Sequence, residues 1–196
     1  MRIGVFGGSF DPPHAAHLIA ANQARSQFKL ERILWIPTFH PPHKNPPIES
    51  FQHRLGMVKT LVAGHPGSEV MDIESTLPQP SYTLNTLWAL KSIFGESHSW
   101  FLIMGADNWS IFPKWHEPQA VLQEAEILLY PRQGIVLRDL PERVQVLNSP
   151  EVPYASRDFR EMVAKLPDQA LSFLPPLVAH YIRRHQLYGV TRKKSP

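Results

Sequence analysis

Residues 7–17, GGSFDPPHAAH, combine two adjacent glycines with two histidines that lie three residues apart. Glycine lets the backbone turn sharply and approach a ligand closely. If a helix begins here, His14 and His17 share one face of its first turn. A helix N-terminus adds unpaired N–H groups and a positive dipole, so the stretch predicts a site for phosphate oxygens. The alternatives are a tight turn with two incidental surface histidines, or a metal site, which lacks an evident third ligand nearby.

Short apolar runs alternate with longer helical patterns along the chain, and they predict the elements that position this stretch. Three of the runs, 33–36, 100–104 and 127–130, are continuously apolar, as in parallel strands that are covered on both faces. The strands are expected at 2–6, 32–36, 69–73, 100–104, 126–130 and 143–147. We therefore expect the α/β class, with a Rossmann-like doubly wound parallel sheet of about six strands. In such sheets ligands bind beyond the carboxyl ends of the strands.

Helices are expected where apolar residues recur at helical spacing, in 18–28, 51–61 and 84–94, and from Pro175 to near Gly189. Serines that could cap helix starts and glycines that could end helices agree with these bounds, at Ser50, Ser81, Gly64 and Gly95. One segment, 36–50, has five prolines and cannot form regular structure. We expect it to be a functional flap, with a simple connection as the alternative.

Length and composition indicate one globular domain, 1–190, that ends in C-terminal helices, and a basic tail, 191–196, that we expect to be disordered. No apolar run approaches the roughly 20 residues of a membrane span. The chain has no cysteine, which excludes a disulfide framework and a thiolate metal site. We expect a soluble, cytoplasmic protein without a membrane partner.

The formal net charge is +3 and the pI is about 9.3, which raises the question of nucleic acid. The basic residues are scattered, except for a cluster near the end of the chain, and no module interleaves aromatic with basic residues. We therefore expect a pocket for a small polyanion and no nucleic-acid partner. The sequence leaves open whether the chain forms a homo-oligomer.

The stretch GGSFDPPHAAH resembles the first motif of the nucleotidylyltransferase superfamily, GxFDPxHxGH. Almost the whole chain is similar to the bacterial nicotinate mononucleotide adenylyltransferase family. The matching blocks are GGSFDPPH, IPTFHPPHK (36–44), PSYTLNTL (80–87), GADNWSIFPKW (105–115) and LPPLVAHYIRRHQLYG (174–189). The first block indicates only the superfamily, whereas the others together indicate the pyridine-nucleotide branch.

The resemblance implies that the phosphate of nicotinate mononucleotide attacks the α-phosphorus of ATP, which releases pyrophosphate and forms nicotinate adenine dinucleotide in NAD biosynthesis. It implies that His14, His17 and Lys44 are catalytic and that Mg²⁺ is held mainly by ATP phosphates and water, with no metal site made by side chains. The residues implied for ATP are Gly7, Gly8, Ser9, Phe10, His14, His17, Gly105, Asp107, Arg132, Ser156 and Arg160.

For the pyridine mononucleotide, the resemblance implies that Trp115 stacks on the ring and that backbone N–H groups at Tyr82 and Thr83 receive the carboxylate. His43 and Lys44 in the flap are candidates to approach the substrate phosphates. The structural alternatives are a core tryptophan, a solvated loop lysine and, for Asp107, a helix cap.

The chain departs from the family pattern in the first motif, in the last motif and at Asn85, which replaces a frequent aspartate where family members vary. Ala16 stands where the first motif has glycine, and in the last motif, ISSTxIR, Ala155 and Arg157 replace a serine and a threonine. Two alternatives to the implied activity stay open, and the changes at Ala16 and in the last motif motivate the second of them. One is an adenylyltransferase that prefers nicotinamide mononucleotide or another phosphate acceptor, and the other is a noncatalytic nucleotide-binding regulator.

Overall fold

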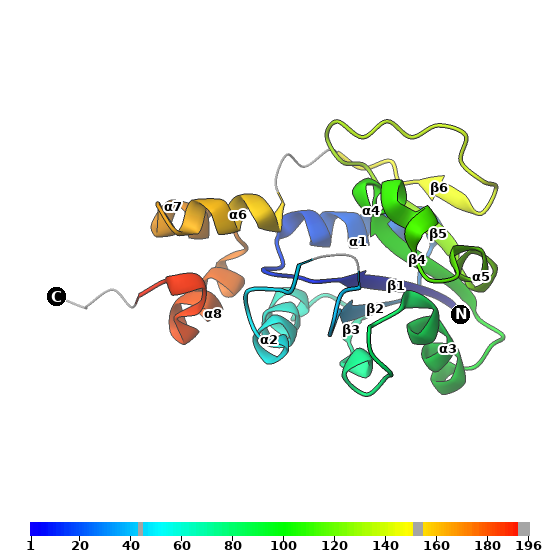
Figure 1. The fold of residues 1–196 in the computed structure, drawn as a ribbon, viewed down its shortest axis with the longest axis horizontal. Helices are drawn as coiled ribbons and strands as arrows, with labels where there is room; N and C mark the ends of the chain where they lie inside the picture. Colours follow the sequence, from blue (N-terminus) through cyan, green and yellow to red (C-terminus); the bar gives the residue numbers. More distant parts are fainter. Residues whose placement is uncertain (43–44, 151–154, 192–196) are drawn as a thin grey trace.

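A parallel sheet forms the centre of the computed structural model (Figure 1). Within the residues that the structure describes, 1–42, 45–150 and 155–191, six strands pair in the order β3-β2-β1-β4-β5-β6. The strands are β1 (Arg2–Gly8), β2 (Arg32–Pro37), β3 (Ser68–Val70), β4 (Ser99–Gly105), β5 (Glu126–Tyr130) and β6 (Val144–Val146). The α/β class and the doubly wound parallel sheet expected from the sequence are confirmed.

Helices cover both faces of the sheet. The longer ones are α1 (Ala15–Phe28), α2 (Phe51–Val62), α3 (Thr83–Phe94), α6 (Ser156–Val163) and α8 (Pro176–His185), and the shorter ones are α4 (Ala106–Ile111), α5 (Pro118–Glu124), α7 (Pro167–Ser172) and the 3₁₀ turns Ile73–Ser75, Phe112–Lys114 and Leu187–Gly189. The described apolar side chains form two clusters, one beneath α1, α2 and α6–α8 and the other beneath α3 and α5. The orange and red C-terminal helices lie beyond one end of the sheet, with α8 against α2 (Figure 1).

The strand order reverses between β1 and β4, and this reversal places the candidate site. The chain leaves β1 toward β2 on one side of the sheet and returns at β4 on the other. Gly8 at the end of β1 pairs with Pro37 of β2, and Phe6 pairs with Ile103 of β4. The carboxyl ends of three neighbouring strands thus meet at a crevice, where doubly wound sheets bind their ligands.

Several predicted boundaries need correction. The third strand was expected at 69–73 but ends at Val70, because the chain turns into the 3₁₀ segment Ile73–Ser75. Ser50 does cap α2, where its hydroxyl accepts the His53 N–H. Ser81, however, is not a cap, since Tyr82 precedes α3 and the Ser81 hydroxyl accepts the His40 N–H instead.

The last helix also differs from the expectation. It ends at His185, earlier than Gly189, because Gln186 adopts a left-handed conformation with φ of 55°. The domain bounds 1–190 stay a prediction, and most of the expected basic tail, 192–196, lies outside the described residues. In the described part of the chain no helix combines the length and the apolar character needed to cross a membrane.

Candidate functional site

The glycines of the first motif end β1 and line an open cleft. A Cβ on Gly8 would lie 3.2 Å from the ring of Phe10, which is tighter than an ordinary contact. Phe10 itself has a φ of 47° and is buried against Phe6, so any contact that it makes with a nucleotide is through its backbone. The glycine and the left-handed turn together bring the chain from the strand to the start of α1.

His14 and His17 lie together at that helix start, as the sequence predicts. Their ring centroids are 3.9 Å apart, and only 1% of His14 and 7% of His17 is exposed. The backbone N–H of His14 donates to Nδ1 of His17 over 3.1 Å. This hydrogen bond assigns the proton of a neutral His17 ring to Nε2, which makes Nε2 a donor suited to a phosphate oxygen.

Burial, together with the nearby charge of Arg132, lowers the pKa of His14 to about 3. The ring is therefore neutral at pH 7 and can donate one N–H. A phosphate chain that enters the site would favour the protonated ring, because a nearby opposite charge stabilises an imidazolium. The histidine pair thus suits a ligand that carries negative charge.

The buried His14 also predicts how stability depends on pH. The unfolded chain binds a proton at the ordinary pKa of 6.5 and the folded chain only at about 3, so stability is lost as the pH falls from about 6.5 toward 3. Between pH 7 and pH 5 this one group contributes a loss of about 2 kcal/mol. In His14→Asn, the free energy of unfolding, measured by urea titration at each pH, should fall less steeply by that amount.

The matched control for this experiment is His180→Asn, because His180 is exposed on α8. That variant should keep the pH profile of the wild type. Parallel profiles for His14→Asn and the wild type would contradict the prediction.

The cleft beside the glycines has a volume of about 850 Å³, part of which is open to solvent. It brings together segments that are far apart in the sequence: the end of β1, the start of the flap, the start of α3 and the turn after α4. Its lining includes Gly7, Gly8, Ser9, Thr38, Pro41, Pro42, Glu74, Ser81, Tyr82, Thr83, Asn108, Trp115 and His116. The rings of His14 and His17 are not in the lining. A phosphate that reaches them must therefore extend from the cleft past Gly7 and Gly8.

The expected acceptor residues, Tyr82, Thr83 and Trp115, all line this cleft. Thr83 is the first residue of α3, so its backbone N–H is one of the groups that a helix N-terminus leaves unpaired. The ring of Tyr82 stacks on His116, with centroids 4.3 Å apart and planes at 22°. The buried indole N–H of Trp115 has no hydrogen-bond partner among the described residues. An aromatic wall and a helix start thus face one space.

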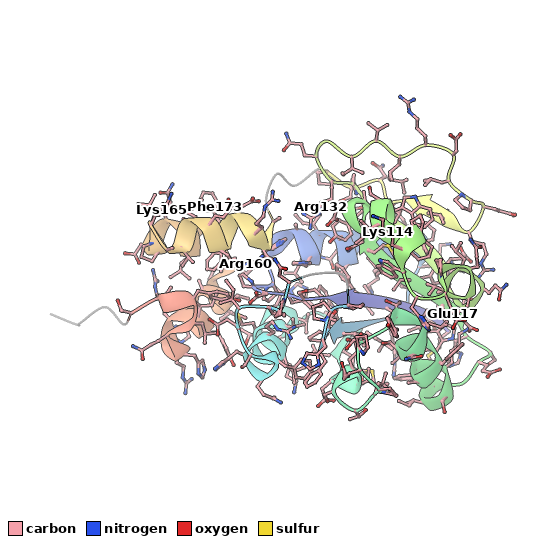
Figure 2. The ribbon with its side chains drawn as sticks, in the orientation of Figure 1. Lys114, Glu117, Arg132, Arg160, Lys165 and Phe173 are labelled. Carbon is pink, nitrogen blue, oxygen red and sulfur yellow. The ribbon has the colours of Figure 1, made fainter. Side chains whose placement is uncertain are left out.

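A second group of expected ATP residues lies where β4 and β5 end. Gly105 directly precedes α4, and a Cβ there would lie 2.2 Å from Oδ1 of Asp107. Nε of Arg132 lies 3.7 Å from the same oxygen, and Arg132 also donates to the Tyr130 hydroxyl. Asp107 is half-exposed and does not cap α4, so the alternative of a helix cap is not what the structure has. Figure 2 shows Arg132 and Arg160 above the sheet, near α1.

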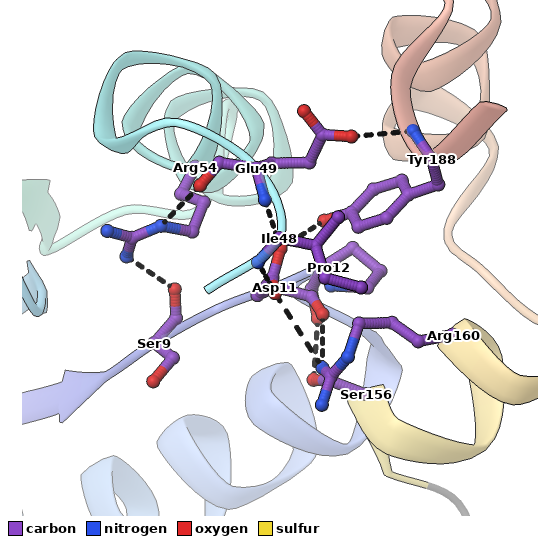
Figure 3. A network of polar contacts seen from close by, with 9 residues as sticks. All are labelled: Ser9, Asp11, Pro12, Ile48, Glu49, Arg54, Ser156, Arg160 and Tyr188. Carbon is purple, nitrogen blue, oxygen red and sulfur yellow. Dashed lines mark hydrogen bonds and ion pairs between the residues drawn. The ribbon is translucent and has the colours of Figure 1, made fainter. Parts of the chain in front are cut away.

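Ser156 and Arg160, which the sequence assigns to ATP phosphates, contact the first motif in this structure (Figure 3). The Ser156 hydroxyl donates to the Pro12 carbonyl over 2.8 Å, and Nη1 of Arg160 donates to the Asp11 carbonyl over 2.6 Å. Arg157 points elsewhere, since its side chain is 76% exposed and pairs with Glu161. These two side chains of α6 therefore support the loop between β1 and α1, residues 9–14, which we call the histidine loop.

Asp11 is the centre of this network (Figure 3). Its side chain is 3% exposed and accepts hydrogen bonds from the backbone N–H groups of Ile48 and Glu49 and from the hydroxyl of Tyr188. Burial and the neighbouring Asp11 carboxylate raise the pKa of Tyr188, so its hydroxyl stays a donor. One carboxylate thus holds the histidine loop, the end of the flap and the segment after α8.

Arg54 extends the network toward the cleft. Only 1% of Arg54 is exposed, and its guanidinium donates to the carbonyls of Ser9 and Glu49. Sequence reasoning did not single out Asp11, Arg54, Glu74 or Tyr188. An aspartate beside the two histidines was a signal for Asp11, but the other three become visible only when the fold brings them together. His43 and Lys44 lie outside the described residues, so their roles stay predictions.

Comparisons with known proteins address the family. A family model described as cytidylyltransferase-like matches residues 5–167. A relative from Synechococcus sp. (strain JA-3-3Ab), named "Probable nicotinate-nucleotide adenylyltransferase", is 36% identical over 95% of this chain and 94% of its own. A relative of the same name from Oceanobacillus iheyensis is 34% identical over 97% of this chain and 98% of its own.

The chain belongs to the nicotinate-nucleotide adenylyltransferase family. It is therefore a nucleotidyltransferase, as the motifs predict. The solved nicotinic acid mononucleotide adenylyltransferase of Plasmodium falciparum, complexed with NaAD, has the same fold, with a TM-score of 0.82, 19% identity and coverage of 98% of this chain and 99% of that chain.

A nicotinate-nucleotide adenylyltransferase is expected to use Mg²⁺ together with ATP. In the described part of the chain, no three His, Cys, Asp or Glu side chains gather as metal ligands. Asp107 is a half-exposed carboxylate at the candidate ATP group, but it is already paired with Arg132. These residues fit a cation that arrives with the ATP phosphates and keeps several waters. Mg²⁺ itself stays a prediction.

Proposed function

We propose that this chain transfers the adenylyl group of ATP to nicotinate mononucleotide, which yields nicotinate adenine dinucleotide and pyrophosphate for NAD biosynthesis. The observation that carries the proposal is that one cleft is lined both by Tyr82, Thr83 and Trp115 and by the glycines of the first motif. The names of the relatives, and NaAD in the solved structure of similar fold, agree with this reaction.

In this reaction an oxygen of the mononucleotide phosphate forms a bond to the α-phosphorus of ATP. The bond from that phosphorus to the bridging oxygen breaks, and pyrophosphate leaves with the electron pair. Because the enzyme forms no covalent intermediate in this proposal, positioning and electrostatic stabilisation carry the catalysis. His14 and His17 donate to the α-phosphate as charge develops there, and Mg²⁺, when bound, neutralises charge on the phosphates.

In this proposal one group of residues binds ATP and another binds the pyridine mononucleotide. Asp107, in the first turn of α4, accepts hydrogen bonds from the ATP ribose, and Arg132 beside it contacts a phosphate. Trp115 stacks on the pyridine ring, and the N–H groups at the start of α3 receive its carboxylate. An amide at the same place offers no negative charge to the helix dipole, so the acid is the preferred acceptor.

The acceptor panel tests this proposal. With ATP and Mg²⁺, pyrophosphate release should be faster with nicotinate mononucleotide than with nicotinamide mononucleotide by about tenfold or more in kcat/KM, because charge-assisted hydrogen bonds discriminate by that amount. Phosphopantetheine should support no release, since it lacks the ring that Trp115 stacks on. The measurement is a coupled pyrophosphate assay with each acceptor.

Other results would support the alternatives. Faster turnover of the amide would make this chain an adenylyltransferase of different preference. Binding of ATP without turnover of any acceptor would instead indicate a noncatalytic nucleotide-binding regulator. Ala16, which is buried in α1, and Arg157, which faces solvent, are the departures from the family pattern that motivate this second alternative.

A further inference from the structure

Glu74 is a buried carboxylate in the wall of the cleft that the proposed mechanism does not use. Only 5% of the residue is exposed, and it lies in the 3₁₀ segment Ile73–Ser75, between β3 and α3. Burying a carboxylate is costly unless hydrogen bonds satisfy its oxygens. The partners of Glu74 therefore indicate what this carboxylate holds in place.

These partners come from two segments on different sides of the cleft. The backbone N–H of Phe39, at the start of the flap, donates to Oε2 over 3.0 Å. The hydroxyl of Thr86, in the first turn of α3, donates to Oε1 over 3.1 Å. Each oxygen of one carboxylate thus binds a different segment, and Glu74 joins the flap to the helix.

Two neighbouring hydrogen bonds strengthen the same junction. The N–H of Ser81 donates to the carbonyl of His40, and the N–H of His40 donates to the hydroxyl of Ser81, both over 3.1 Å. The flap residues beside this junction, Pro41 and Pro42, line the cleft, and so do Tyr82 and Thr83 at the start of the helix. The two walls that would enclose the pyridine mononucleotide are therefore tied together at their base.

The surroundings of Glu74 act on its pKa in opposite directions. Burial raises the pKa of Glu74, whereas the hydrogen bonds from Phe39 and Thr86 and the charge of Arg54 oppose that change. Arg54 holds the carbonyl of Glu49 at the other end of the flap. The buried side chains of Glu74 and Arg54 thus anchor the flap at both of its ends.

We propose that Glu74 is a positioning residue for the pyridine mononucleotide, because it holds the start of the flap and the start of α3 at the separation that the acceptor requires. The inference rests on the proposed function for the identity of the acceptor. It does not assign Glu74 a contact with ATP or with the reacting phosphates.

The test compares Glu74→Gln with Glu69→Gln, a control at the exposed middle residue of β3, where Glu69 pairs with Arg32. Gln has one acceptor oxygen in place of two, so it can accept a hydrogen bond from Phe39 or from Thr86 but no longer from each on its own oxygen. In Glu74→Gln, the KM for the mononucleotide should rise about tenfold, which is the effect of one hydrogen bond to a charged group, while the KM for ATP stays within about twofold. Hydrogen exchange of the peptide that contains Phe39 should become about tenfold faster in the absence of substrates.

Thr86→Val is the second variant, because it removes one donor and leaves the carboxylate in place. It should change the KM of the mononucleotide in the same direction, and combining it with Glu74→Gln should add little. Unchanged exchange at Phe39, or equal increases in both KM values, would overturn the proposal. If the wild type does not use nicotinate mononucleotide, the proposed function fails, but the exchange measurement still decides whether Glu74 holds the flap.

Discussion

Replacing His17 with alanine is expected to lower the kcat of adenylyl transfer by about 10²- to 10³-fold, with the KM for ATP changed by less than about threefold. The Nε2–H of His17 would stabilise charge that develops on the α-phosphate only in the transition state. Losing one such preorganised donor costs rate and leaves ground-state binding nearly intact. The measurement is steady-state pyrophosphate release at saturating acceptor.

The environment of His17 explains why the effect should be large. Its Nδ1 accepts the His14 N–H, and the ring packs edge-on against Phe10 with centroids 5.0 Å apart. The ring is therefore oriented before substrate arrives, so little reorganisation is needed during the reaction. Water is largely excluded, because only 7% of the residue is exposed.

Two further variants separate catalysis from folding. His17→Asn can still accept the His14 N–H but cannot reach as far as Nε2, so it should preserve the loop better than alanine and lose as much kcat. His180→Ala, on the exposed face of α8, should retain wild-type turnover. A His17→Ala enzyme with more than a third of wild-type kcat would refute the assigned role.

Replacing Asp11 with alanine is expected to lower the free energy of unfolding by about 3 kcal/mol or more and to reduce kcat/KM strongly. The change leaves the N–H groups of Ile48 and Glu49 and the hydroxyl of Tyr188 without their acceptor. Each buried donor left without a partner costs about 1–3 kcal/mol, less where water enters. Urea unfolding gives the stability, and the pyrophosphate assay gives the activity.

Tyr188→Phe is the graded comparison for this experiment. It deletes one hydroxyl and its 2.8 Å hydrogen bond to Asp11, and it keeps the ring packed against Phe159. The expected loss is about 1 kcal/mol, well below that of Asp11→Ala. Equal losses in the two variants, or no loss in Asp11→Ala, would mean that Asp11 does not organise the network.

The fold could be predicted because its strongest signals are local. Continuous apolar runs such as 100–104 are typical of strands covered on both faces, and the structure places a strand at Ser99–Gly105. The third strand was predicted less well, because Ile73 continues the apolar pattern although the backbone has already turned into a 3₁₀ segment. The pattern of apolar residues indicates which side chains are buried but not where a strand ends. Ile73 is buried, although it does not belong to the strand.

The site could be predicted where a motif carries its own chemistry. His14 and His17 are neighbours in space because they are neighbours on one helical turn. Glu74 and Arg54 have no such local signal, since their partners come from segments that only the tertiary fold assembles. The hydrogen bond from Arg160 to the Asp11 carbonyl also joins residues that are 149 positions apart in the sequence. Its predicted role at the ATP phosphates is not tested by these contacts.

The hydrogen bond between Asp11 and Tyr188 spans 177 residues of chain and has a consequence for synthesis on the ribosome. Protein domains are made from the N-terminus, and contacts between distant segments form late. The two histidines emerge early, but the hydroxyl that helps to hold their loop is made 177 residues after Asp11. A nascent chain therefore carries the first motif without this hydrogen bond until Tyr188 has been made.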